Sequence, residues 1–136
     1  MILPFNRIRE LKIKFIIMII AVDFDGTITK HNEFPEINEI CPYCIDVLTE
    51  MISRGHKLVL NTMRSGIYLN DAVKFIESNG LQLYGVNYTP GQKSWTKSPK
   101  VYADIYIDDA ALGIPITDGG YLDWKEIRRQ LINKGY

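Results

Sequence analysis

The sequence predicts an α/β protein with a mainly parallel central sheet covered by helices on both faces. Apolar runs rich in β-branched residues alternate with segments of helical periodicity, and polar clusters follow several of the apolar runs. The chain has 136 residues, of which 46% are hydrophobic, enough for one domain with one core. We therefore expect a single three-layer α/β/α domain.

The first half of the chain predicts a β-α-β unit. The run "KFIIMIIAVDF" (14–24) and the run "KLVLNT" (57–62) are typical of strands buried on both faces. Gly55 lies where a helix commonly ends. The apolar residues before it recur at helical spacing; they are Ile45, Leu48, Met51 and Ile52.

The second half continues the alternation of helices and strands. A helix is expected over 67–78, and strands over 81–89 and 103–109. The closing segment 123–135 predicts a helix in which Asp123 is the N-cap. Alternation of this kind indicates a parallel sheet.

Residues 1–15 are interpreted as an N-terminal extension to a domain of residues 16–136, with Met18 as an alternative start. Basic residues followed by "FIIMIIAV" resemble a signal peptide. The apolar run is much shorter than the roughly 20 residues of a membrane span, and cleavage after it would remove the strand that follows. We expect no membrane segment.

The overall charge is balanced, with sixteen basic and sixteen acidic residues. Composition therefore gives no clear nucleic-acid patch and no attraction to an anionic membrane, while an oligomer stays open. Two cysteines, Cys41 and Cys44, are too few for a disulfide scaffold, so a cytoplasmic location is expected.

The two cysteines form the motif "CPYC", a signature found in glutaredoxins. The polar segment before the motif lacks the strand that a redox motif of this type should follow. The alternative, which we favour, is that Pro42 occupies the first turn of a helix and the cysteines are packing residues.

Polar residues follow three of the predicted strands: Asp23 and Asp25 after the first, Thr62 at the end of the second, and Asp108 and Asp109 after a later one. In open parallel sheets such strand ends lie along one edge. If these ends are adjacent, four carboxylates meet, and their mutual repulsion predicts a hard divalent cation such as Mg²⁺.

The motif "DFDGT" after a buried strand, a strand ending in threonine, a lysine upstream of the last acidic strand, and "YIDD" together resemble the haloacid dehalogenase (HAD) superfamily of phosphohydrolases. The resemblance covers residues 16–113 and implies a Rossmann-like fold. Each interval between motifs is largely filled by one helix and its loops, so no cap domain is expected.

The resemblance implies a role for each matching residue. Asp23 would be the nucleophile that forms an aspartyl-phosphate, and Asp25 the general acid and base, whose backbone carbonyl also binds the metal. Thr62 would donate its hydroxyl to a phosphoryl oxygen. Asp108 and Asp109, with Asp23, would complete the Mg²⁺ site.

Two further residues are less clearly assigned. The catalytic lysine is expected to be Lys100, which is nearest the last strand, with Lys97 second and Lys93 also open. Arg64 is expected to bind a substrate phosphate or carboxylate, or alternatively to cap a surface loop. His31 lies just after the first motif, near the expected substrate, although an exposed histidine is commonly incidental.

The expected function is therefore a Mg²⁺-dependent phosphohydrolase acting on a phosphorylated substrate. Three alternatives stay open: phosphoryl transfer to an acceptor other than water, a non-catalytic module that binds a phosphorylated ligand, and redox chemistry at the CPYC motif. An open site without a cap suits a bulky substrate, or a small phosphate ester bound with modest specificity.

Overall fold

The computed structural model describes residues 16–31 and 33–136, and the predicted extension 1–15 lies outside them. The strands are β1 (Ile19–Val22), β2 (Lys57–Leu60), β3 (Gly85–Val86) and β4 (Ile105–Ile107). The helices are α2 (Cys44–Ser53), α3 (Gly66–Ser78), α4 (Trp124–Asn133) and the single-turn 3-10 helix η1 (Gln92–Ser94).

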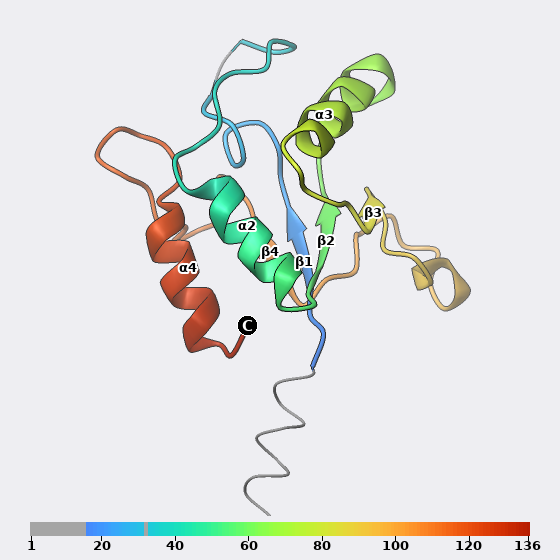
Figure 1. Ribbon diagram of the computed structural model, residues 1–136. Coiled ribbons are helices and arrows are strands. Elements are labelled where there is room, and N and C mark those ends of the chain that lie inside the picture. Colours follow the sequence, from blue (N-terminus) through green and yellow to red (C-terminus); the bar gives the residue numbers. More distant parts are fainter. Residues whose placement is uncertain (1–15, 32) are drawn as a thin grey trace, which may run out of the picture.

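All four strands are parallel and lie in the order β3-β2-β1-β4, which confirms the α/β, Rossmann-like fold class (Figure 1). The chain builds the sheet outward from β1 to β3 and then returns to place β4 on the other side of β1. The direction of winding therefore reverses between β1 and β4. In folds of this class, the crevice at such a reversal is where ligands bind.

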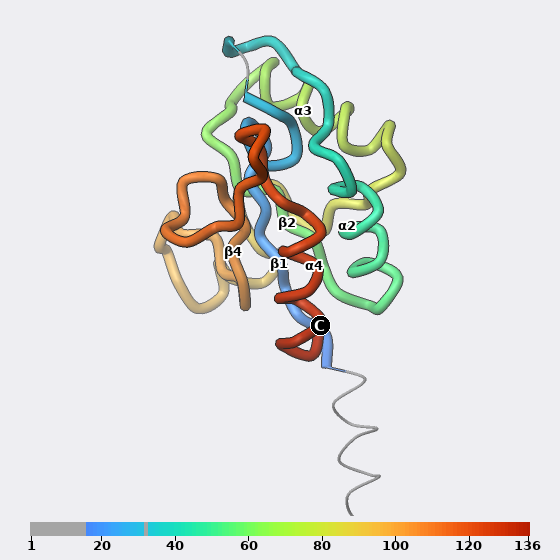
Figure 2. Tube along the Cα trace, turned by 90° about the vertical axis from the view of Figure 1, so that its left-hand side faces the viewer, coloured from blue at the N-terminus to red at the C-terminus, as the bar shows by residue number. Residues whose placement is uncertain are grey.

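The three long helices pack on one face of the sheet. Ile20 and Val22 of β1 and Leu60 of β2 share a buried core with residues of α2, α3 and α4. Figure 2 shows these helices on one side of the sheet and the connection from β3 to β4 on the other. This division follows from right-handed crossovers, because the return from β3 to β4 runs in the opposite direction across the sheet.

The expectation that helices cover both faces holds for one face only. On the second face, Ala21 and Val59 pack against Val101, which comes from the β3–β4 connection. That connection holds no regular helix beyond η1. Pro90 and Pro99 interrupt the segment, which lacks the apolar periodicity of a helix.

The elements agree with the predicted ones in place, but the strands are shorter. The strand expected over 81–89 pairs only at Gly85–Val86, because the chain folds back at once. A Cβ on Gly85 would lie 2.2 Å from the carbonyl oxygen of Tyr88. The N-cap prediction is confirmed, since the Glu126 N–H donates to the Asp123 side chain at 3.1 Å.

The start of α2 differs from the prediction. The helix begins at Cys44, and Pro42 lies in the turn before it rather than in the first helical turn. Tyr43 between them has a φ of 67°, a left-handed conformation that a helix cannot include. Within the described part of the chain, no helix is long and apolar enough to cross a membrane.

Candidate functional site

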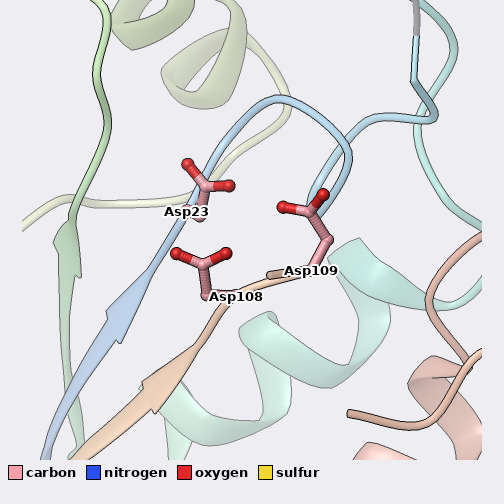
Figure 3. Close-up of side chains that lie close together, drawn as sticks. All are labelled: Asp23, Asp108 and Asp109. Carbon is pink, nitrogen blue, oxygen red and sulfur yellow. The ribbon is translucent and has the colours of Figure 1, made fainter. Parts of the chain in front are cut away.

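Three aspartates meet at the carboxyl ends of β1 and β4. Asp23 follows β1, and Asp108 and Asp109 follow β4 (Figure 3). One carboxylate oxygen from each lies within 4.8 Å of the others, an arrangement that can hold a metal ion. The Asp23 N–H donates to the Ile107 carbonyl at 3.0 Å, so the backbone fixes the two strand ends side by side.

The electrostatics of this acidic cluster favour a cation. Burial raises the pKa of Asp23 to about 7, and its hydrogen bond with Asp109 and the charges of Asp108 and Asp109 add to the rise. Three carboxylates that offer oxygen ligands at one place, two of which disfavour the charge of Asp23, fit the ligand set of Mg²⁺. The residues present therefore suit the expected metal.

Thr27 joins the cluster, although the motif resemblance implied no role for it. Its buried hydroxyl lies 3.2 Å from the carboxylates of both Asp23 and Asp109, and it accepts the Asp109 N–H at 3.0 Å. Its carbonyl accepts the Trp124 indole N–H at 3.0 Å. The sequence shows Thr27 within the "DFDGT" motif, but it does not show that Thr27 contacts Asp109, 82 residues away.

A tight turn brings Thr27 back toward the cluster. Gly26 has a φ of 79°, in the left-handed region. A Cβ there would lie 2.3 Å from the His31 ring and 2.8 Å from an Asp109 oxygen. Both the conformation and the space therefore require glycine at this position.

His31 reaches the cluster from the loop that follows the first motif. Its Nε2 lies 2.9 Å from Asp109 Oδ2, while two thirds of its side chain (67%) stays exposed. We call residues 29–31 and 33–40 the flap; a bridge between Thr29 and Ile40 closes it, and Figure 1 shows it above the carboxyl ends of the strands. The structure thus places this histidine at the rim of the site.

Asp25 is not part of the acidic cluster. Its carboxylate accepts two hydrogen bonds from Arg64, at 2.7 Å from Nε and 2.8 Å from Nη2. This is a bidentate pair, the strongest geometry available to an arginine and a carboxylate. Three of the four carboxylates that were expected to meet therefore lie together, and the fourth, that of Asp25, pairs with the Arg64 guanidinium instead.

Arg64 also holds the flap. Its side chain is only 1% exposed and donates to the carbonyl oxygens of Pro35, Glu36 and Tyr68. The guanidinium lies 5.1 Å from the ring centres of both Phe24 and Phe34. Arg64 was expected to bind a substrate phosphate or carboxylate, or to cap a surface loop; in the structure it donates to Asp25 and to backbone carbonyls.

Thr62 lies at the end of β2 as expected. Its N–H donates to the Asn87 side chain at 2.8 Å, and its hydroxyl oxygen accepts the Arg64 N–H at 3.1 Å. A threonine hydroxyl accepts through lone pairs and donates through one proton. The proton of Thr62 is therefore left for another acceptor.

The candidate lysines have other neighbours in the structure. The Lys100 ammonium lies 5.5 Å from the ring centre of Tyr106, and that of Lys93 lies 5.1 Å from Tyr88. Lys97 lines a cavity with Lys93. Among the residues that the structure describes, none of the three forms an ion pair with an aspartate of the cluster.

The cysteines lie outside this site and are both buried and unbridged. Burial raises the pKa of the Cys41 thiol and raises that of Cys44 well above its usual value. A redox-active thiol needs a lowered pKa and an accessible sulfur. The environment of the CPYC motif therefore supports packing rather than redox chemistry.

Comparison with known proteins gives one informative relative. No protein-family model matches the chain, and no curated protein matches it significantly. A solved structure, described as a conserved protein from Bacteroides thetaiotaomicron, matches with a TM-score of 0.75 and 34% identity, covering 88% of this chain and 93% of that one. The chain therefore belongs to the same family as this conserved Bacteroides protein.

Proposed function

We propose that the protein is a Mg²⁺-dependent phosphohydrolase of the HAD superfamily that acts on a phosphate monoester. The observation that carries the proposal is the meeting of Asp23, Asp108 and Asp109 at the point where the sheet reverses its winding. Their oxygen atoms suit Mg²⁺, and Asp23 is also the first residue of the "DFDGT" motif.

Asp23 is the proposed nucleophile. One carboxylate oxygen forms a bond to phosphorus while the bond to the leaving oxygen breaks, and water then cleaves the aspartyl-phosphate and releases inorganic phosphate. Bound Mg²⁺ would be held by Asp23, Asp108 and Asp109 and would supply positive charge that offsets the repulsion among the anionic groups. Thr27 holds Asp23 and Asp109 in one position through its hydroxyl.

Asp25 is the proposed general acid and base. It gives a proton to the leaving oxygen and later takes one from the attacking water, so its carboxyl must lie at a defined position. Arg64 supports that position through two hydrogen bonds. Thr62 supplies a hydroxyl proton to a phosphoryl oxygen, since its own oxygen is already positioned by the Arg64 N–H.

The described chain shows no second folded unit over this site, because the segments between its strands form single helices, loops and the flap. The proposed substrate is therefore not limited to a small enclosed molecule. The flap carries His31 against Asp109, so it is a segment that can contact the leaving group.

The test is phosphate release from an aryl phosphate by the purified protein, with Mg²⁺ or with EDTA. We expect Asp23→Asn to abolish release and the exposed control Asp118→Asn to leave it unchanged. Parallel variants Lys93→Ala, Lys97→Ala and Lys100→Ala identify the catalytic lysine by the one that loses turnover. Mg²⁺ binding without release from a panel of phosphate esters would instead indicate a non-catalytic phospho-ligand module.

A further inference from the structure

The connection between β3 and β4 carries a surface of lysines and exposed aromatic side chains, of which the proposed reaction uses one lysine and none of the rings. Residues 87–103 contain three lysines and no acidic residue, whereas the whole chain has equal numbers of basic and acidic residues. Exposed aromatic side chains accompany these lysines: Trp95, 65% exposed, lies between Lys93 and Lys97, and Tyr88 and Tyr102 lie before and after the three lysines. We call this surface the lysine–aromatic surface; Figure 2 shows its backbone on the side of the sheet opposite the helices.

One part of the lysine–aromatic surface is a cavity of about 390 Å³ lined by aromatic rings. Trp95 and Tyr102 meet edge to face with ring centres 5.7 Å apart. Tyr106 also lines the cavity, and the Lys100 ammonium lies 5.5 Å from the centre of the Tyr106 ring. A cavity of this size suits one flat ring system. Tyr106 belongs to β4, the strand that Asp108 follows.

A second cavity of about 360 Å³ lies next to the first, and Thr96 and Ser98 line both. Two ammonium groups, those of Lys93 and Lys97, belong to its wall. Lys93 lies 5.1 Å from the ring centre of Tyr88. The surface therefore repeats one combination, an exposed ring beside a lysine, over neighbouring hollows.

This surface is held in shape by a buried glutamine. The Gln92 side-chain oxygen accepts the N–H groups of Thr89 and Tyr102, and its nitrogen donates to the Lys100 carbonyl at 2.9 Å. These bonds tie the two ends of the connection together. A ligand would therefore meet a preformed surface and lose less entropy on binding.

We propose that the lysine–aromatic surface binds single-stranded nucleic acid. Unpaired bases stack on exposed rings, and lysines beside those rings attract the intervening phosphates. A duplex keeps its bases stacked inside, and an acidic peptide offers carboxylates but no succession of flat rings. The repeated pairing of ring and lysine thus favours a single strand over both.

The test is titration of the full chain with an oligothymidylate of about 12 nucleotides, within the usual site sizes. EDTA is present throughout, so the result does not depend on the proposed phosphohydrolase activity. Trp95 is exposed and Trp124 is buried, so stacking is expected to quench the fluorescence of Trp95. Three neutralised phosphates predict a slope of about −2 for log K against log salt, or roughly a 20-fold loss from 50 to 200 mM.

Variants separate stacking from charge. Trp95→Ala is expected to weaken binding, followed by electrophoretic mobility, by about tenfold, while Trp95→Phe retains most of it. Replacing Lys93, Lys97 and Lys100 by Gln together should remove the salt dependence. Tyr43→Ala is the matched control, because Tyr43 is also exposed with a lysine 4.4 Å from its ring centre, but on another surface.

Circular dichroism of each variant checks that it is folded. The proposal is overturned if the oligonucleotide fails to bind at low salt, if Trp95→Ala and Tyr43→Ala bind equally well, or if polyglutamate or a duplex quenches Trp95 as strongly as the single strand.

Discussion

Replacing Arg64 by alanine separates two interpretations of this residue. As a substrate ligand, Arg64 could be removed with little effect on folding, because the site would only lose affinity. In the structure it instead joins Asp25 and the flap from a position that is almost fully buried. We therefore expect Arg64→Ala to destabilise the fold.

The expected magnitude follows from the contacts that are lost. Two charge-assisted hydrogen bonds to Asp25 disappear, each of the kind that contributes about 1.5–3 kcal/mol. Three backbone carbonyls lose a donor, and the rings of Phe24 and Phe34 lose a cation 5.1 Å away. Removing one partner of a fully buried ion pair costs about 3–5 kcal/mol; because the Asp25 side chain is 31% exposed, we expect a smaller loss, about 2–3 kcal/mol.

Urea unfolding followed by far-UV circular dichroism measures the loss. Arg64→Lys keeps the charge but not the bidentate geometry, so it should lie between the wild type and Arg64→Ala. Arg129→Ala is the control, since its ion pair with Glu126 is exposed and should contribute less than about 1 kcal/mol. A double-mutant cycle with Asp25→Asn isolates the coupling between the paired side chains.

The steady-state kinetics of Arg64→Ala test whether Arg64 positions Asp25 or binds the substrate. If Arg64 positions Asp25, Arg64→Ala should lower kcat for an aryl phosphate more than it raises KM. The reasoning is refuted if Arg64→Ala stays within about 1 kcal/mol of the wild-type stability and changes only KM, because Arg64 would then act as a substrate ligand.

Three further predictions concern the acidic cluster and the cysteines. The pKa of Asp23 is raised to about 7 in the folded protein, so its protonated carboxyl contributes to stability at low pH. This contribution is fully present below about pH 4 and is lost as pH rises through 7. Its size is on the order of 2 kcal/mol after allowing for the partial exposure of the side chain. Thermal unfolding in EDTA at pH 8 should therefore show Asp23→Asn to be more stable than the wild type, and added Mg²⁺ should stabilise only the wild type; equal melting temperatures would contradict this. Thr27→Val should weaken Mg²⁺ binding by about tenfold or more in calorimetry, with Thr27→Ser close to the wild type, because the hydroxyl orients two ligands. Cys41 and Cys44 should resist thiol reagents in the folded protein and react once it unfolds in urea, and rapid labelling of the native chain would contradict their packing role.

The class of fold and the positions of the candidate site residues could be predicted from the chain pattern alone. Apolar runs that alternate with helical periodicity require a parallel sheet, and residues that follow parallel strands share one edge of it. Asp23, Asp108 and Asp109 could therefore be expected at one place, and the structure brings them together. Local rules also predicted the Asp123 cap, since it depends on residues a few positions apart.

The pairing of side chains within that region, in contrast, depends on contacts between distant parts of the chain. Asp25 pairs with Arg64, 39 residues away, and Thr27 bridges to Asp109, 82 residues away. The order of the strands placed the β3–β4 connection on the second face, where it forms the lysine–aromatic surface. Chain pattern limits where a residue can lie, but the direction of its side chain depends on packing among distant segments, and no local periodicity records that packing.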